Sequence, residues 1–144
     1  MSLATDSSNN QAAITELMAG EMAQVDAVIH RRLASEVVLI NQISHYIVSA
    51  GGKRLRPLLV LLFSRALGFE QPARFELAAT VEFIHTATLL HDDVVDESSL
   101  RRGRQTANAL FGNAASVLVG DFLYSRAFQM MVETQNMRVM DILA

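Results

Sequence analysis

The sequence predicts an all-α fold, and three observations lead to that prediction. Apolar residues recur at steps of three and four along most of the chain, which is the spacing of one helix face. The 2 prolines and five of the 7 glycines lie in or beside short stretches between these segments, where such residues end helices. With 144 residues, of which 51% are hydrophobic and 19% charged, the chain has the length and composition of one folded globular domain.

The first half of the chain predicts three helices after a disordered start. Residues 1–10 are polar and are expected to be disordered, and an amphipathic helix follows over residues 11 to about 30. A second helix is expected over about 35–49, because its apolar residues lack the strict alternation of a strand. Glycines at 51–52 then break the chain. A third helix is expected from Pro57, which suits a first turn, to Gly68.

The second half predicts a long helix, a loop and two further helices. Helical spacing runs from about Ala73 to Glu97, and the glycine-containing stretch 98–106 is expected to be a loop. The helix from Asn113 to about Thr134 is apolar almost all round, so it needs burial inside a larger core or in a homodimer. Residues 137–144 are expected to form the first turns of another helix, cut off there, and no strand is expected.

The most informative motif is the acidic run HDDVVDE at positions 91–97. At about 100° per residue, Asp92 and Asp96 lie within about 40° of each other on a helix, and Asp93 lies about 60° beyond Asp96, so all three can share one face. A divalent cation would relieve their repulsion, and oxygen ligands at this spacing suit Mg²⁺ shared with substrate phosphates. A solvated acidic helix end is the alternative, but two apolar turns lead directly into the run.

Two basic clusters offer sites for phosphate groups. GGKRLRP at 51–57 places Lys53, Arg54 and Arg56 beside a glycine pair at an expected helix start, where backbone N–H groups favour anions. The glycines lack the spacing of a P-loop. RRGR at 101–104 is the second cluster, and each cluster alone equally fits a solvated surface. Together with the acidic run and the apolar helices, they indicate a site for diphosphates that carry apolar tails.

Two histidines precede the aspartates on the expected long helix. His85 precedes Asp92 by seven residues, so it shares the face of that aspartate about 10 Å lower. A core histidine bonded to a backbone carbonyl and a histidine that contacts a ligand are both open for His85. His91 lies about 100° from Asp92 and is assigned no role.

Three segments, GGKRLRP, EFIHTATLLHDDVVDESSLRRGR and GNAASVLVGDFLYSRAFQMM, closely resemble the trans-type polyprenyl diphosphate synthases. The resemblance begins at about Gln11 and is greatest to the long-chain branch that makes quinone side chains, the octaprenyl synthases among them. It implies an isoprenoid synthase-type helical bundle, of which residues 11–144 are the N-terminal half. It also implies a Mg²⁺-dependent prenyltransferase that condenses an allylic diphosphate with isopentenyl diphosphate into a long-chain all-trans product.

The family motifs imply roles for individual residues. Asp92, Asp93 and Asp96 match the first aspartate-rich motif and are the expected catalytic carboxylates. Of these, Asp92 and Asp96 are the expected direct metal ligands. Arg101 matches the arginine that contacts the allylic diphosphate. The expected contacts to isopentenyl diphosphate are Lys53, Arg56, His85 and Arg102.

The resemblance also implies that side chains one turn below Asp92 limit the length of the product. Ala87 and Thr88 stand where short-chain members carry bulky aromatic residues, so the pocket is expected to stay open. Deeper in the helix, Ile84 and Val81 would line the tunnel at about 12 and 16 Å from Asp92. An open tunnel implies a product longer than twenty carbons.

One departure from the family pattern limits the inference. Family members are longer and carry a second aspartate-rich motif, whereas Asp121 and Asp141 stand alone here. We therefore expect the N-terminal part of a larger enzyme, inactive by itself. Two other hypotheses are a terpene cyclase-like protein, in which Lys53, Arg56 and Arg102 would have no substrate, and a non-catalytic subunit of a heteromeric prenyl synthase.

Composition narrows the partners and the compartment. A net charge of −3 and a pI near 5.7 argue against a general nucleic-acid binder. The chain has no cysteine, which excludes a disulfide framework and a thiolate zinc site. The apolar run Leu58–Phe63 is too short to cross a membrane, and the opening residues lack a secretory signal pattern. We expect a cytoplasmic homodimer without a transmembrane segment.

Overall fold

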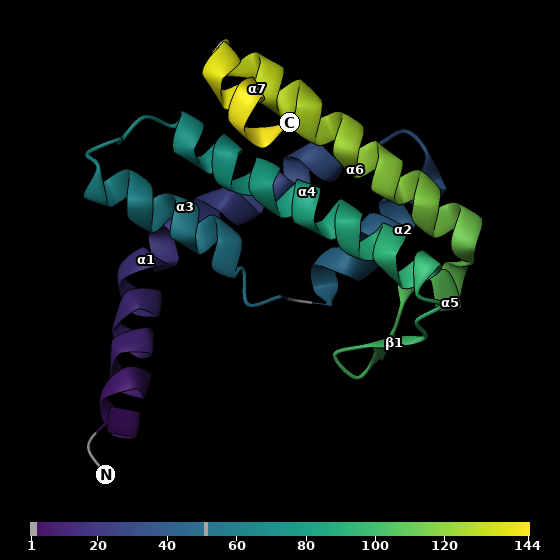
Figure 1. The fold of residues 1–144 in the computed structure, drawn as a ribbon, viewed down its shortest axis with the longest axis horizontal. Helices are drawn as coiled ribbons and strands as arrows, with labels where there is room; N and C mark the ends of the chain where they lie inside the picture. Colours follow the sequence, from purple (N-terminus) through teal and green to yellow (C-terminus); the bar gives the residue numbers. More distant parts are fainter. Residues whose placement is uncertain (1–2, 51) are drawn as a thin grey trace.

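In a computed structural model, which describes residues 3–50 and 52–144, these residues form seven α-helices and one small hairpin (Figure 1). The all-α prediction is confirmed. The elements are α1 (Leu3–Leu33), α2 (Val38–Ser49), α3 (Leu55–Ala66), α4 (Ala73–Val95), β1 (Leu100–Arg101), β2 (Arg104–Gln105), α5 (Ala107–Phe111), α6 (Asn113–Glu133) and α7 (Met137–Leu143).

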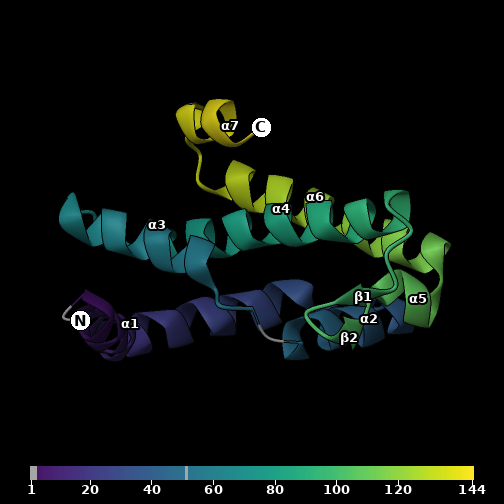
Figure 2. The same cartoon turned by 60° about the horizontal axis from the view of Figure 1, so that its bottom comes forward.

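Most of the helices are arranged in two layers (Figure 2). Helices α3, α4 and α6 form one layer, and α1, α2 and α5 form the other together with the hairpin. Helix α4 packs most extensively against α6 and also contacts α3 and α1. Buried side chains from helices α1 to α6 fill the core, among them Met18, Val25, Ile29, Ile43, Leu61, Phe83, Leu123, Met130 and Met131. This burial fixes the direction of α4, which carries most of the predicted site.

Helix α1 begins at Leu3, eight residues before the predicted start at Gln11. The helix therefore passes through Asn10, which does not cap it. Serine and asparagine are only modestly poorer helix formers than alanine, and the first ten residues contain no proline or glycine to stop the helix. Residues 1–2 of the segment expected to be disordered lie outside the described residues, and so does Gly51 of the expected glycine break.

Helix α2 begins at Val38 instead of at about Ser35. The Ser35 N–H donates to Asn41 Oδ1 (3.0 Å), and Asn41 Nδ2 donates back to Ser35 O (2.6 Å). Such local side-chain bonds offer the backbone an alternative to helical bonding, so the chain enters the helix later than its apolar pattern predicts.

The stretch 98–106, predicted to be a loop without strands, contains a short antiparallel hairpin instead. Its two central residues, Arg102 and Gly103, have φ angles of 51° and 75°. Positive φ at both positions is typical of a type I′ turn, whose twist matches that of paired strands. Strands of two residues have no detectable alternation, so the apolar pattern gave no sign of them.

Helix α4 ends at Val95, two residues before the predicted end. The Ser98 N–H donates to Asp93 O (2.9 Å). The Glu97 N–H donates to Val94 O (3.3 Å), and Glu97 has a left-handed φ of 52°. This is a Schellman ending in which a glutamate occupies the position that glycine usually takes.

Helices α4 and α6 approach closely where His91 meets Gly120. A Cβ atom on Gly120 would overlap His91 Nε2, so the ring lies directly against the glycine backbone. The same nitrogen lies 3.3 Å from Val117 O and 3.3 Å from Asp121 Oδ1, and the ring stacks on Tyr124. His91, which was assigned no role, therefore holds the acidic end of α4 against α6.

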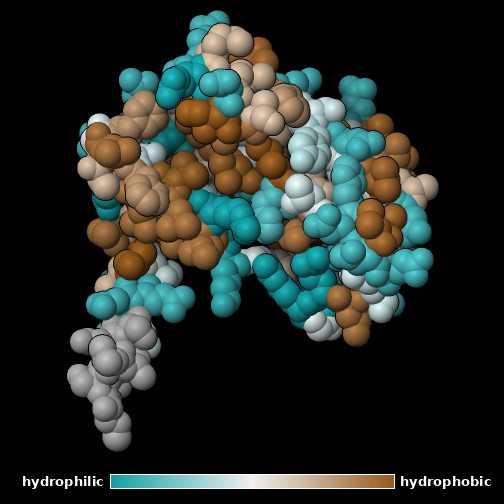
Figure 3. All heavy atoms as spheres, in the orientation of Figure 1, coloured by the Kyte–Doolittle hydropathy of each residue, from teal (hydrophilic) through white to brown (hydrophobic). Residues whose placement is uncertain are grey.

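Apolar side chains are exposed on several helices, notably on α3 and α6. Figure 3 shows hydrophobic surface gathered over α3, where Leu59, Phe63 and Leu67 are exposed. On the outer face of α6, Leu118 is 60% exposed and Val132 is 61% exposed. In the part of the chain that the structure describes, no helix combines the length and apolar character needed to cross a membrane.

Candidate functional site

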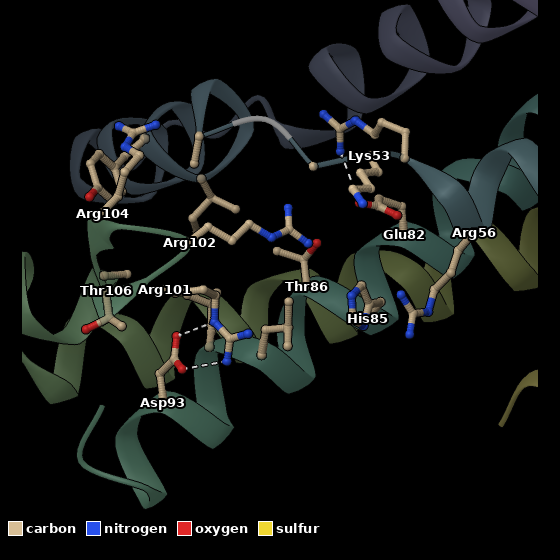
Figure 4. A pocket seen from close by; sticks show the side chains of 18 of the residues that line it. Lys53, Arg56, Glu82, His85, Thr86, Asp93, Arg101, Arg102, Arg104 and Thr106 are labelled. Carbon is tan, nitrogen blue, oxygen red and sulfur yellow. Dashed lines mark hydrogen bonds and ion pairs between the residues drawn. The ribbon is translucent and has the colours of Figure 1, made fainter. Parts of the chain in front are cut away.

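A pocket of about 260 Å³ opens between α2, α3, α4 and the hairpin (Figure 4). Its lining carries six cationic side chains and two carboxylates, an excess of four positive charges in a chain whose net charge is −3. The cationic residues are Lys53, Arg54, Arg56, Arg101, Arg102 and Arg104, and the carboxylates are Glu82 and Asp93. Such a concave cationic surface attracts polyanions.

The pocket brings together two predicted clusters that are about fifty residues apart in the sequence. In Figure 4, Lys53, Arg56 and His85 lie at one end, and Asp93 and Arg101 lie at the other. Arg102 lies between them, with its Nη1 atom close to the backbone of Gly52. Six predicted site residues therefore line one pocket: Lys53, Arg56, His85, Asp93, Arg101 and Arg102.

His85 lies in an electropositive part of the pocket. Burial lowers the pKa of its imidazole below the ordinary value of 6.5, and the positive charge of Arg56 lowers it further. The ring is therefore neutral near pH 7 and can present one N–H donor and one acceptor.

At the other end of the pocket, Arg101 is held by Asp93. The Arg101 Nε donates to Asp93 Oδ2 (3.0 Å) and its Nη2 donates to Oδ1 (2.7 Å), which makes the pair bidentate. The hydrogen bond to Asp93 raises the pKa of the Arg101 guanidinium. Asp93 is buried, whereas Arg101 is exposed, so the carboxylate fixes the direction of an arginine whose outer edge stays accessible.

Residues outside the predicted set hold the hairpin in place. The Tyr46 hydroxyl donates to Gln105 O (2.6 Å), and the Arg104 guanidinium lies 4.8 Å from the Tyr46 ring centroid. The Thr106 hydroxyl donates to Ser98 O (2.8 Å). The Thr106 side chain also caps α5. Threonine directly before a helix is a capping signal that can be recognised in a sequence. Nothing local marks Tyr46, because its partner is 59 residues away.

Asp92 and Asp96 lie outside the pocket lining, at the end of α4. Both side chains are exposed, and they lie one helical turn apart. A helix C-terminus carries partial negative charge, so these carboxylates are unfavourably placed unless a cation is near. Within the described residues there is no group of three or more histidine, cysteine or acidic residues that could enclose a metal.

These two carboxylates nevertheless fit Mg²⁺ as a shared ion. Mg²⁺ commonly binds through one or two carboxylates together with water and substrate phosphates, without a complete protein cage. Asp93 does not fit as a ligand in this arrangement, because both of its oxygens are bonded to Arg101.

The residues of the predicted chain-length pocket differ in their surroundings. Ala87 is fully buried in the core between helices. Thr88 is half-buried, and its hydroxyl donates to His85 O (2.6 Å). Ile84 and Val81 are also half-buried. At about 100° per residue, Thr88, Ile84 and Val81 lie on the same side of α4 as Asp92, whereas Ala87 does not.

Comparisons with known proteins agree with this architecture. Residues 37–144 match the polyprenyl synthetase family. The chain is 58% identical over 135 residues to an octaprenyl diphosphate synthase from Escherichia coli. The matched region covers 94% of this chain and 42% of that protein. The chain thus spans about two fifths of the length of this relative.

Two solved structures are similar in both sequence and fold. A decaprenyl diphosphate synthase from Rhodobacter capsulatus has a TM-score of 0.87 and 54% identity, covering 92% of this chain and 41% of that one. A polyprenyl synthase from Caulobacter crescentus CB15, complexed with calcium and isoprenyl diphosphate, has a TM-score of 0.86 and 50% identity, covering 90% and 40%. The predicted isoprenoid synthase-type helical fold is confirmed.

Proposed function

Because the chain belongs to the polyprenyl synthetase family, we propose that the protein condenses an allylic diphosphate with isopentenyl diphosphate to give a long-chain all-trans polyprenyl diphosphate. The observation that carries the proposal is the pocket with four excess positive charges beside the acidic end of α4. Two diphosphates bring many negative charges to one place, and the excess positive charge of this lining offsets a large part of them.

The reaction breaks the allylic C–O bond, and the electron pair of that bond leaves with the diphosphate. The double bond of isopentenyl diphosphate then attacks the allylic carbocation and forms the new C–C bond. Loss of a proton to the departing diphosphate restores a double bond. The protein therefore needs to orient two substrates, stabilise the departing diphosphate anion and exclude water, without a protein nucleophile.

We assign the two ends of the pocket to the two diphosphates. Arg101, oriented by Asp93, would bind the allylic diphosphate and stabilise the charge that develops as it leaves. The neutral His85 would donate its N–H to the other diphosphate without adding charge. Isopentenyl diphosphate would be held by Lys53, Arg56, His85 and Arg102.

Asp92 and Asp96 would hold Mg²⁺ at the mouth of the pocket. The bound ion would supply Lewis-acid stabilisation of the negative charge on the allylic diphosphate. The relative from Caulobacter crescentus was solved with calcium and isoprenyl diphosphate, which supports a role for a divalent cation in this family. We further propose quinone side chains as the use of the product, a cytoplasmic location, and a homodimer in which the exposed face of α6 is covered.

The proposal is tested with the product of the complete open reading frame. Farnesyl diphosphate and labelled isopentenyl diphosphate are supplied with Mg²⁺, and the dephosphorylated alcohols are separated by chromatography. We expect long-chain products, and we expect Asp92→Ala or Lys53→Ala to lower turnover by orders of magnitude. The 144-residue chain assayed alone should form no product. Near-normal turnover with Asp92→Ala would contradict the assignment.

A further inference from the structure

Arg54 belongs to the basic segment before α3 but differs from its neighbours. Lys53 and Arg56 are exposed, whereas the Arg54 side chain is only 19% exposed. The Arg54 Nη1 donates to Glu82 Oε1 on α4 at 3.2 Å. Its Nε also pairs with Asp26 Oδ1 on α1 at 3.6 Å. The arginine therefore fastens the segment to two helices that are remote from it in the sequence.

The backbone of Arg54 also has an unusual conformation. Its φ and ψ angles are 50° and 33°, in the left-handed region that side chains with a Cβ atom rarely adopt. The Leu58 N–H donates to Arg54 O (3.1 Å), so this residue is also the point at which α3 begins. The direction of the chain on either side, at Lys53 and at Arg56, therefore depends on a conformation that the ion pairs of Arg54 hold in place.

The charge of Glu82 also indicates a structural role for its ion pair with Arg54. It lies in the lining of a pocket that attracts anions, and its side chain is 11% exposed. An unpaired carboxylate there would be costly to bury and would repel a diphosphate. Figure 4 shows Glu82 at the same end of the pocket as Lys53, His85 and Arg56. Its ion pair with Arg54 gives this acidic group a structural use.

We propose that Arg54, Glu82 and Asp26 form a positioning network that sets Lys53 and Arg56 for one diphosphate. Arg54 acts through these neighbours and is not itself a phosphate ligand. The inference rests on the proposed function, because it assigns Lys53 and Arg56 to isopentenyl diphosphate. The network predicts that removing the negative charge of Glu82 weakens the binding of a diphosphate. Charge repulsion alone would predict tighter binding.

The test uses steady-state kinetics with the product of the complete open reading frame. The variants are Arg54→Asn, since asparagine tolerates the left-handed conformation, and the near-isosteric Glu82→Gln. Each is expected to raise the KM for isopentenyl diphosphate about tenfold, with kcat and the KM for the allylic substrate changed less than about twofold. The double variant should match the single ones, because both break the same link. Asp26→Asn should give a smaller rise of about threefold, since that carboxylate is half exposed.

Arg74→Gln is the matched control. Arg74 also joins α4 to α1, through Glu21 at 3.3 Å, and its side chain is 17% exposed, but it is not part of the pocket lining. This variant should lower the melting temperature without changing the KM for isopentenyl diphosphate. If Glu82→Gln lowers that KM while Arg54→Asn raises it, Arg54 is a direct ligand and the proposal is wrong. A fall in kcat alone would mean only a loss of folded protein and would equally overturn it.

Calorimetric titration with inorganic diphosphate separates this inference from the proposed function. If the protein makes no prenyl product, the proposed reaction fails, but the dissociation constant for diphosphate still reports on the network. Weaker binding in both Arg54→Asn and Glu82→Gln would support it. Tighter binding in Glu82→Gln, or no diphosphate binding by the wild type, would overturn it.

Discussion

Neighbouring aspartates on α4 have different surroundings, although the sequence presents them as one motif. Asp93 is 5% exposed and accepts two hydrogen bonds from Arg101, whereas Asp92 is exposed. The division follows from helix geometry, because consecutive residues point about 100° apart. One carboxylate therefore orients an arginine and the other remains available to a metal ion.

This difference predicts unequal effects of two variants on the free energy of unfolding. Asp93→Ala should lower the free energy of unfolding by about 1–2 kcal/mol, because it removes the partner of a half-exposed arginine. Asp92→Ala should change it by less than about 0.5 kcal/mol, although it is expected to abolish turnover. Urea denaturation followed by circular dichroism measures both. Equal losses of stability would contradict the separate roles.

The lowered pKa of His85 predicts a pH dependence of stability. The folded state disfavours the protonated ring, so the unfolded chain binds more protons as the pH falls below the ordinary pKa of 6.5. The contribution of His85 to stability should therefore be fully present above that pH and should fall as the pH drops below 6.5. His85→Gln should flatten this part of a plot of melting temperature against pH. A profile unchanged by the substitution would show that other groups cause the dependence.

At the scale of the secondary-structure element, the C-terminal end of α4 has an unusual residue. Glu97 occupies the left-handed position of the Schellman ending of α4. A residue with a Cβ atom is unfavourable there, so Glu97→Gly should stabilise the protein by about 0.5–1 kcal/mol. The change should raise the urea midpoint without altering its slope. The control is Gly103→Ala at the hairpin turn, where φ is 75° and the same argument predicts a loss.

The two faces of α4 predict different consequences for the two residues expected to limit product length. Thr88 lies on the half-buried side shared with Asp92. Thr88→Phe should therefore shorten the product while the first condensation proceeds normally. Ala87 is fully buried, so Ala87→Phe should overpack the core and cost about 1–3 kcal/mol of stability. Chromatography of the alcohols and thermal unfolding measure the two effects. Product of unchanged length with Thr88→Phe would mean that the tunnel runs elsewhere.

The sequence predicted the long elements well because helical periodicity is local and repeats over several turns. It missed the early start of α1 and the hairpin, since neither a continuous polar helix nor a two-residue strand produces a pattern. The charged clusters of the site were found because their members are adjacent in the chain. The partners of Arg54 and Tyr46 were not, because these contacts span 28 and 59 residues and no local signal records them.

At the scale of the whole molecule, the outer face of α6 is an apolar surface left exposed on an otherwise buried helix. Leu118 and Val132 are more than half exposed on a helix whose other face is buried in the core. Isolated exposed apolar residues are common, but two on one face of a buried helix favour an interface. The homodimer proposed above would cover them.

Sedimentation at micromolar concentration tests that dimer. We expect the wild-type protein to sediment as a dimer and Leu118→Glu to sediment as a monomer, because a buried unpaired charge is costly. Leu67→Glu is the control, since Leu67 is 82% exposed on α3 and lies outside the proposed interface. A monomeric wild type, or a dimer that Leu118→Glu leaves intact, would contradict the proposal.

The contact between Gly120 and the ring of His91 also constrains which residues related chains can carry. The ring occupies the space in which a side chain at position 120 would begin, so the two positions share one fixed volume. A homologous chain with alanine or serine at 120 is therefore expected to have a smaller residue at 91, or α4 and α6 lying further apart. Since the two aspartates that follow position 91 belong to the proposed site, a substitution at position 120 of α6 is expected to displace the acidic end of α4. The two positions should vary together as a pair across the family.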